Sequence, residues 1–197
     1  MSPFPLLPTA FCLLAGASAW DKGIFAVGSD HACAMPFCGS DMGSPDCKPT
    51  CWGKGADGQT TVPDGVAFVE LAAGSHHTCG LDASGVASCW GYGAEGQTNP
   101  ATAARFSSLA LGDIHSCGLT LDAEVACWGG NSRGQTDVPQ IEGNATWLEV
   151  ASGLEHTCAL SRNETDGVRS IYCWGRNTYG QLEAPSTFKC ACSPRNA

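Results

Sequence analysis

Charged residues are scarce in this chain. It has 10 Lys and Arg and 19 Asp and Glu among 197 residues, so 15% of it is charged, whereas a typical soluble domain is about 25% charged. The basic residues are scattered and the net charge is −9. This argues against nucleic acid as the main partner, since a phosphate-binding surface needs clustered Lys and Arg. Disorder is not expected either, because 43% of the residues are hydrophobic.

Long apolar runs are also lacking. Residues 6–19 are largely apolar, but roughly 20 such residues are needed to anchor a chain across a bilayer. The small residues Ala17 and Ala19 form the pattern that signal peptidase accepts, so residues 1–19 are predicted to be a secretory signal that is cleaved before Trp20. A buried N-terminal segment is the alternative. The mature chain is therefore expected to be secreted and extracellular, without a membrane anchor.

Cysteine and glycine, in contrast, are abundant, with 13 and 25 residues. Removal of the signal takes away Cys12 and leaves an even number of cysteines, which in an exported chain predicts a disulfide framework. The sequons at Asn144 and Asn163 agree with export and are candidate glycosylation sites.

The strongest signal is a pattern that occurs four times. Each copy carries an aromatic residue, a Gly-x-x-His-x-Cys segment, a Cys-Trp-Gly segment and a Gly-Gln pair, in that order. A period of roughly 40 residues with several short strands is typical of propellers and β-solenoids. The recurring residues are His31, His77, His115 and His156, then Trp52, Trp90, Trp128 and Trp174, and the cysteine pairs Cys33 and Cys51, Cys79 and Cys89, Cys117 and Cys127, and Cys158 and Cys173.

Within each copy, short stretches alternate apolar and polar residues, and Gly, Pro, Asn and Asp cluster between them. No segment keeps a helical period. We therefore predict an all-β, β-propeller-type repeat array with four recognisable blades, which is a partial or small propeller. The predicted boundaries are 1–19 for the signal, 20–189 for the array with blades at about 20–63, 64–100, 101–139 and 140–185, and 190–197 for a C-terminal tail.

The cysteine spacing predicts one cross-strand disulfide in each blade. Cys79 and Cys89 are centred on Ser84, so a hairpin with a three-residue turn places them directly opposite each other. Cys117 and Cys127 have the same separation. In the first and last copies the separation is larger, and we attribute the extra residues to insertions at the hairpin tip.

Four further cysteines lie outside this scheme. A bridge between Cys38 and Cys47 is plausible locally, but it leaves a strained pair two residues apart, Cys190 and Cys192. The alternative is that both tail cysteines reach the first blade and tie the two ends together.

Local motifs that suggest other chemistry are better explained as structure. Residues 53–58 and 91–96 match the dinucleotide pattern G-x-G-x-x-G, but the residues after them cannot start a helix, so tight turns are predicted. The recurring histidines suggest zinc ligands, yet one buried side chain per blade that bonds to neighbouring backbone is the simpler interpretation. The tryptophans are expected to pack between blades rather than stack on a sugar. No catalytic residue, metal or cofactor is predicted, and the protein is not expected to be an enzyme.

These motifs resemble the repeat of the regulator of chromosome condensation family over about residues 24–188. They look most like the secreted, short-blade branch that includes a bacterial β-lactamase-inhibitor propeller and plant receptor-kinase ectodomains. The resemblance implies a β-propeller whose loops on one face bind a protein partner. Because the family usually has seven blades, four motifs and a fifth start at Phe188 leave an incomplete propeller, a four-bladed closure or a truncated gene. An open arc would expose strand edges, through which the chain could self-associate.

The predicted function is non-enzymatic protein–protein binding by a secreted module, with an unidentified extracellular protein as partner. The expected contact loops are 36–49, 92–99, 131–138 and 162–169. One alternative is guanine-nucleotide exchange on a small GTPase, which the signal peptide, the paired cysteines and the acidic charge oppose. Another is inhibition of an extracellular enzyme, which the sequence does not distinguish from protein binding in general.

Overall fold

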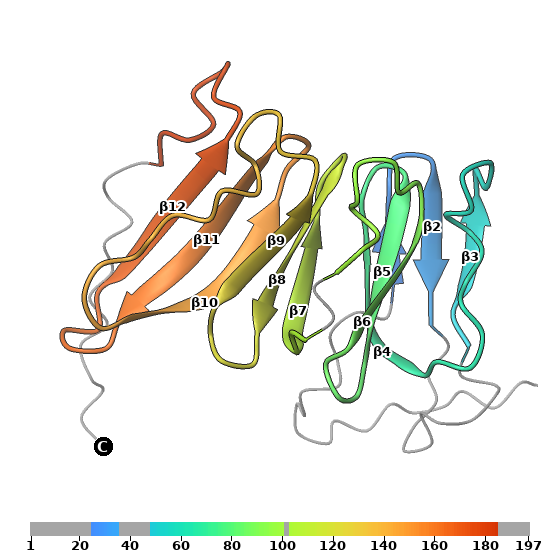
Figure 1. Ribbon diagram of the computed structural model, residues 1–197, viewed down its shortest axis with the longest axis horizontal. Helices are drawn as coiled ribbons and strands as arrows, with labels where there is room; N and C mark the ends of the chain where they lie inside the picture. The colour runs from blue at the N-terminus through green and yellow to red at the C-terminus, as the bar shows by residue number, and fades with distance from the viewer. Residues whose placement is uncertain (1–24, 36–47, 101–102, 185–197) are drawn as a thin grey trace, which may run out of the picture.

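The computed structural model describes residues 25–35, 48–100 and 103–184, and within them the chain forms twelve strands (Figure 1). Every three consecutive strands make one antiparallel sheet, in the order β1-β2-β3, β4-β5-β6, β7-β8-β9 and β10-β11-β12. The predicted all-β class with four blades is therefore confirmed. The strands are β1 Phe25–Val27, β2 His31–Ala34, β3 Thr50–Gly53, β4 Phe68–Ala73, β5 His77–Asp82, β6 Ala87–Gly91, β7 Phe106–Leu111, β8 His115–Thr120, β9 Val125–Gly129, β10 Ala145–Ser152, β11 His156–Asn163 and β12 Arg169–Gly175.

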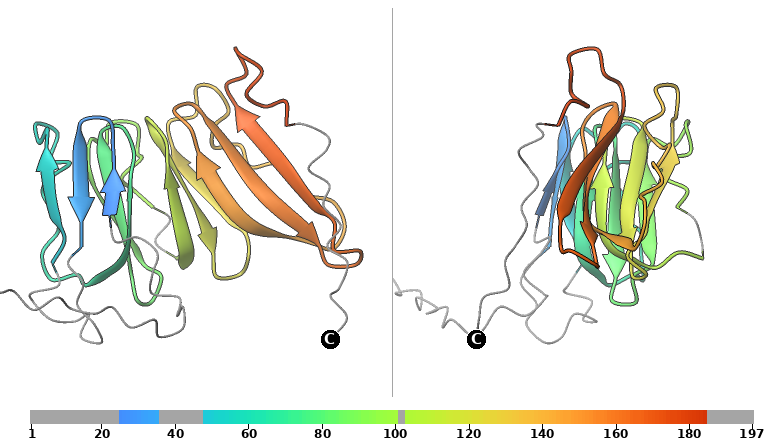
Figure 2. Two further views of the ribbon diagram at one scale, coloured as in Figure 1. Left: turned by 180° about the vertical axis from the view of Figure 1, so that it is seen from behind. Right: turned by 90° about the vertical axis from the view of Figure 1, so that its left-hand side faces the viewer.

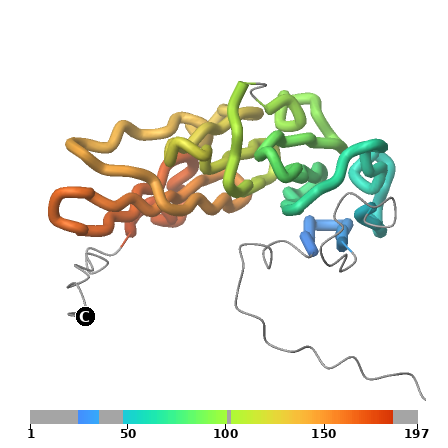
Figure 3. The backbone as a smooth tube through the Cα atoms, turned by 90° about the horizontal axis from the view of Figure 1, so that it is seen from below, coloured from blue at the N-terminus to red at the C-terminus, as the bar shows by residue number. Residues whose placement is uncertain are grey.

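The four sheets stack side by side in chain order and form an open row (Figures 1 and 2). The first strand of each sheet packs against the first two strands of the preceding sheet, as β4 does against β1 and β2. The sheets β1–β3 and β10–β12 lie at opposite ends, and a view from below shows the same order (Figure 3). The described residues thus form a partial propeller and not a closed four-bladed ring.

Register in each sheet follows from the hairpin turns. In the second sheet Asp82 Oδ1 accepts hydrogen bonds from the backbone N–H groups of Ser84 and Val86, and Gly85 takes φ +80°, a value that favours glycine. This turn places Cys79 directly opposite Cys89.

The described residues contain four disulfides, each between directly opposed residues of the second and third strands of a sheet. Their Cα–Cα distances are 4.0 to 4.1 Å, as expected for a close antiparallel pair. These are the pairs that the cysteine spacing predicts. They are Cys33–Cys51, Cys79–Cys89, Cys117–Cys127 and Cys158–Cys173. Cys38, Cys47, Cys190 and Cys192 lie outside the described residues, as does the predicted signal.

The core is divided into three clusters, one between each pair of neighbouring sheets. Between the first two sheets, Cys33 of one sheet lies in the same buried cluster as Phe68 and Trp90 of the other. The Phe68 and Trp90 rings are 5.5 Å apart, and Phe106 and Trp128 repeat this contact at 5.4 Å in the next sheet. Each sheet is thus thin and gains most of its buried apolar contacts from its neighbours.

The first sheet departs from this pattern. Phe25, the aromatic residue of the first copy, pairs with Ala34 and so takes the place that Leu71 has opposite Gly80, not that of Phe68. It is 69% exposed, and the described residues include no sheet before it. In the part of the chain that the structure describes, no helix is long and apolar enough to span a membrane.

Candidate functional site

A repeated set of hydrogen bonds joins each sheet to the next. His77 Nε2 lies 2.9 Å from Ser116 Oγ of the following sheet, and this hydroxyl donates to the Gln97 carbonyl at 2.9 Å. The Trp128 indole donates to the same carbonyl at 2.8 Å. Because the hydroxyl has a single proton and gives it to the carbonyl, the histidine must donate from Nε2. We call this set (histidine, hydroxyl, Gln carbonyl and indole) the junction.

The other two pairs of sheets have the same junction. His31 Nε2 lies 2.8 Å from Thr78 Oγ1, and His115 Nε2 lies 2.9 Å from Thr157 Oγ1. The corresponding Gln59 and Gln135 carbonyls accept from both the hydroxyl and the indole of the next sheet; the donors are Thr78 with Trp90 and Thr157 with Trp174. The sequence correctly suggested a structural histidine, but its partner is a hydroxyl of the next sheet and not neighbouring backbone.

Burial keeps the junction histidines neutral. It lowers the pKa of both His77 and His115 to about 4, because the charged ring is poorly solvated there, and nearby histidines add to the effect. The pKa of His31 is lowered for the same main reason. A Cβ at Gly74 would lie 2.5 Å from His77 Cε1, so the ring packs closely against a position where only glycine fits.

Two of the recurring residues lie outside any junction among the described residues. His156, in the last sheet, is only half-buried, whereas His77 and His115 are fully buried. Trp52, in the first sheet, is 54% exposed, so the prediction that it packs between blades is wrong. Both departures have one cause, because each residue faces outward from an end of the row.

The loops that follow β3, β6, β9 and β12 lie at one edge of the row, at the top of Figure 1. In each loop the glutamine that ends the motif accepts, through Oε1, a hydrogen bond from the backbone N–H two residues before it, as Gln97 does from Glu95 at 3.0 Å. Gly96 N donates to Gly93 O at 3.0 Å, and no helix follows. The G-x-G-x-x-G segments are therefore tight turns, and the glutamine fixes their shape.

These loops carry unlike side chains on a constant backbone. In each sheet the first residue of the loop donates its N–H to the carbonyl of the residue before the histidine, at 2.8 to 2.9 Å. The donor–acceptor pairs are Lys54 with Asp30, Tyr92 with His76, Gly130 with Ile114, and Arg176 with Glu155. We define the loop face as residues 54–58, 92–96, 130–134 and 176–180 together with these four acceptor residues.

Charge on the loop face differs along the row. Lys54 Nζ lies 4.0 Å from both Asp30 and Asp57 at one end. At the other end the Glu155 carboxylate accepts from the Arg176 guanidinium and lies 3.9 Å from Arg133 Nε. The hydrogen bond from Arg176 holds the pKa of Glu155 below its usual range. These exposed pairs order the surface side chains more than they stabilise the fold.

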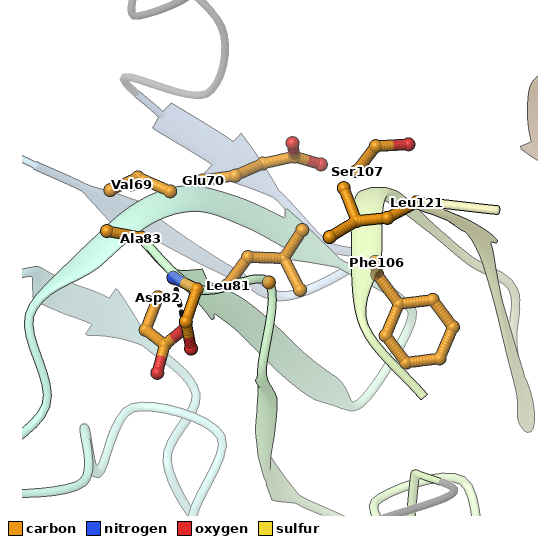
Figure 4. Close-up of a pocket in the computed structure, with 10 residues that line it drawn as sticks. Val69, Glu70, Leu81, Asp82, Ala83, Phe106, Ser107 and Leu121 are labelled. Atoms are coloured by element: carbon orange, nitrogen blue, oxygen red, sulfur yellow. Dashed lines mark hydrogen bonds between the residues drawn. The ribbon is translucent and has the colours of Figure 1, made fainter. Parts of the chain in front are cut away.

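The surface has a groove along the turns that join the first two strands of each sheet and a pocket at the edge opposite the loop face. A groove of about 310 Å³ is lined by the turns between the first two strands of all four sheets, including Gly28, Gly74, Gly112 and Gly153. A pocket of about 200 Å³ lies at the opposite edge, between the β5–β6 turn and β7 (Figure 4). The two carboxylates that line this pocket have structural roles. Asp82 accepts a hydrogen bond from Ser84 N in its own turn, and Glu70 Oε1 accepts one from Leu109 N at 2.9 Å.

The four loops that were predicted to contact a partner do not all lie at one edge of the row. Loops 92–99 and 131–138 lie at the edge of the loop face. Loop 162–169 contains the β11–β12 turn and lies at the opposite edge (Figure 1). Most of loop 36–49 lies outside the described residues.

The model of the regulator of chromosome condensation (RCC1) repeat matches residues 68–97, 106–135 and 147–181, which are the second, third and fourth sheets with their loops. The chain belongs to the RCC1 repeat family. This match and the propeller neighbours below confirm the predicted resemblance, although the secreted, short-blade branch stays a prediction. No match is found among the curated proteins.

Three solved structures are similar to this RCC1-repeat chain. The ectodomain of the receptor kinase CR4 from Physcomitrella patens is 28% identical with a TM-score of 0.58, over 77% of this chain and 38% of that one. The CRINKLY WD40 ectodomain of the receptor kinase ACR4 from Arabidopsis thaliana is 25% identical with a TM-score of 0.56. The match covers 77% of this chain and 49% of that one. Yeast RCC1 (Prp20) is 19% identical with a TM-score of 0.62, and the match covers 82% of this chain and 45% of that one. At this identity the likeness shows the shared fold alone. The chain spans less than half the length of each of these proteins.

Proposed function

We propose that this RCC1-repeat protein is a secreted, non-enzymatic module that binds another protein through its loop face. The observation that carries the proposal is the constant frame of that face. Four loops share their turns and backbone hydrogen bonds, while the side chains they present are an ion pair, an aromatic ring with an imidazole, an aliphatic residue with glycine, and a second ion pair. A rigid scaffold with variable loop side chains is the usual design of a recognition surface.

The composition of the loop face supports a protein as the partner. Tyr179 is 86% exposed and lies under the Arg176 guanidinium, 5.9 Å from ring centroid to Cζ, and Tyr92 is 37% exposed. Tyr and Arg are enriched where proteins bind one another, and they dominate the binding energy there. One end of the face has two carboxylates around one lysine and the other has two arginines around one carboxylate, so the two ends would fix the orientation of a partner with complementary charge.

Secretion is proposed on two grounds. Each of the four described sheets is thin and is braced by a disulfide, and such bridges form and persist in oxidising compartments. The two plant proteins to which the chain is similar are receptor ectodomains. The likeness to yeast RCC1 gives no support to nucleotide exchange, since at that identity it concerns the fold.

The first test is the intact mass of the protein from the medium of an expressing cell, before and after reduction. We expect a chain that begins at Trp20 and gains about two mass units per disulfide on reduction. Retention in the cell with Met1 and free thiols would contradict secretion and favour the nucleotide-exchange alternative.

The second test maps the binding face. Immobilised wild type is compared with Tyr92→Ala and Glu95→Ala, which alter exposed residues of the loop face, and with Leu121→Ala, which alters a 63% exposed residue at the opposite edge. The same extracellular protein should be retained by wild type and the Leu121 variant and lost by the loop-face variants. Equal retention by all four would refute the assignment of the face.

A further inference from the structure

Among the residues that the structure describes, the outward side of the last sheet has one half of a junction and lacks the other half. Cys158 and His156 are half-buried, whereas their counterparts Cys79 and His77 are completely covered by the following sheet. Gln181 is likewise half-buried, and among the described residues its carbonyl has no indole or hydroxyl donor, unlike the Gln59, Gln97 and Gln135 carbonyls. We call this side the acceptor end.

The outward side of the first sheet has the complementary half. Trp52 occupies the position of Trp90 and Trp128, whose indoles donate to a Gln carbonyl of the preceding sheet. In the described part of the structure its own N–H has no such carbonyl, and the ring is 54% exposed. Phe25 is on the same side of the sheet, since its partner Ala34 lies two residues from Ala32, the partner of Trp52, and it is 69% exposed. We call this side the donor end.

A second pair of groups matches across the two ends. Inside the row, Leu109 N donates at 2.9 Å to Glu70 Oε1, the residue after the bulge in the preceding sheet. Glu149 follows the corresponding bulge in β10 and is exposed at the acceptor end. Phe25 has the place in β1 that Leu109 has in β7, so its N–H points outward from the donor end.

We infer that the acceptor end of one chain binds the donor end of a second copy. The Trp52 indole would donate to the Gln181 carbonyl and the Phe25 N–H to Glu149, so that two exposed apolar rings are buried on the uncovered disulfide face. Contacts between unlike surfaces of identical chains either close into a ring or continue as a longer assembly, and both results contain this contact. The loop face is not used.

One element of the junction is missing from this contact. The hydroxyl residue after the histidine is Thr78, Ser116 or Thr157 inside the row, but in the first sheet the corresponding residue is Ala32. His156 would therefore find no acceptor in the second copy, and the contact is weaker than a junction inside the row. This difference supplies a substitution that strengthens the contact if the inference is correct.

The test is sedimentation equilibrium of the full secreted chain over a range of concentrations. Trp52→Ala should weaken association by about tenfold or more, as expected for a buried interfacial tryptophan. Ala32→Thr should strengthen it by roughly fivefold, because it supplies the acceptor for His156. Leu121→Ala removes a 63% exposed apolar side chain in the β8–β9 turn, away from both ends of the row, and should change nothing. Because Trp52 and Ala32 are not buried in the core, these variants are expected to fold.

Mixing two variants distinguishes this contact from other dimers. Trp52→Ala damages the donor end and Glu149→Arg damages the acceptor end, so each alone associates weakly, but a mixture contains one intact contact and should associate more strongly than either. A dimer built from two donor ends would not recover on mixing. A monomer at all concentrations, or an affinity that Ala32→Thr and Trp52→Ala leave unchanged, would overturn the inference.

Discussion

Acidification should weaken the fold through the junction histidines. The pKa of His77 and of His115 is about 4 in the folded protein against 6.5 for an ordinary histidine. The unfolded chain therefore binds more protons between these values, so stability is complete above pH 6.5 and declines as the pH falls toward 4. At about pH 5 each histidine should lower the free energy of unfolding by about 2 kcal/mol, or about 4 kcal/mol together.

The structure supplies the physical reason for this cost. Each junction histidine already donates from Nε2 to a hydroxyl, so an added proton must go to Nδ1. The Nδ1 atoms of His77 and His115 are buried without a hydrogen-bond partner among the described residues, and they lie against Gly74 and Gly112. Protonation would bury an unsatisfied donor as well as a charge.

The assay is urea unfolding with the disulfides intact, followed by tryptophan fluorescence at about pH 7.5 and about pH 5. His77→Gln keeps a side-chain donor and removes one titrating ring, so it should reduce the difference in unfolding free energy between the two pH values by about 2 kcal/mol. His76→Gln is the control at the adjacent residue, because His76 belongs to no junction and its charge is the smallest of the causes that lower the pKa of His77, so most of the pH dependence should remain. Equal stability of the wild type at both pH values, or a pH dependence that His77→Gln leaves intact, would refute the reasoning.

Three further predictions concern stability and modification. Gly74→Ala places a Cβ 2.3 Å from the Gly112 carbonyl oxygen and should lower the free energy of unfolding by about 3 kcal/mol, measured by urea unfolding. Under limiting reductant, differential alkylation with peptide mass spectrometry should show Cys158–Cys173 reduced before the three other described disulfides, because only its cysteines are both partly exposed. The sequons meet at the edge opposite the loop face, where Glu164 N donates to the Asn144 carbonyl. If Asn144 and Asn163 carry glycans, an N-glycosidase should lower the mass without changing partner binding.

Much of this fold could be predicted from residue spacing, because the features are local. The separation of ten residues between Cys79 and Cys89 around one turn determines that they lie opposite each other, and the structure has this pairing. The same spacing contradicts the predicted position of loop 162–169 on the partner-binding face. It lies between Cys158 and Cys173, as the turn at Ser84 lies between its own pair, so it belongs at the hairpin edge and not with the loop face.

The junction could not be predicted in the same way, because its partners are distant in the sequence. His31 and Thr78 are 47 residues apart and meet only when one sheet packs on the next. A signal was present nonetheless. A hydroxyl residue follows the histidine in the last three copies and alanine follows it in the first, so each described sheet that packs on another described sheet before it carries the hydroxyl.

This dependence on neighbours has a consequence for the whole row. When each unit contacts only the units beside it, stability is close to a sum over units and interfaces, so four sheets have three junctions and the end sheets have one each. The first sheet is the weaker end, since its strands have three or four residues and its aromatic side chains are exposed. Local opening should therefore begin at β1–β3 and not at the longer strands β10–β12. A contact that covers the donor end would stabilise the first sheet, which is the least stable of the four, against this local opening.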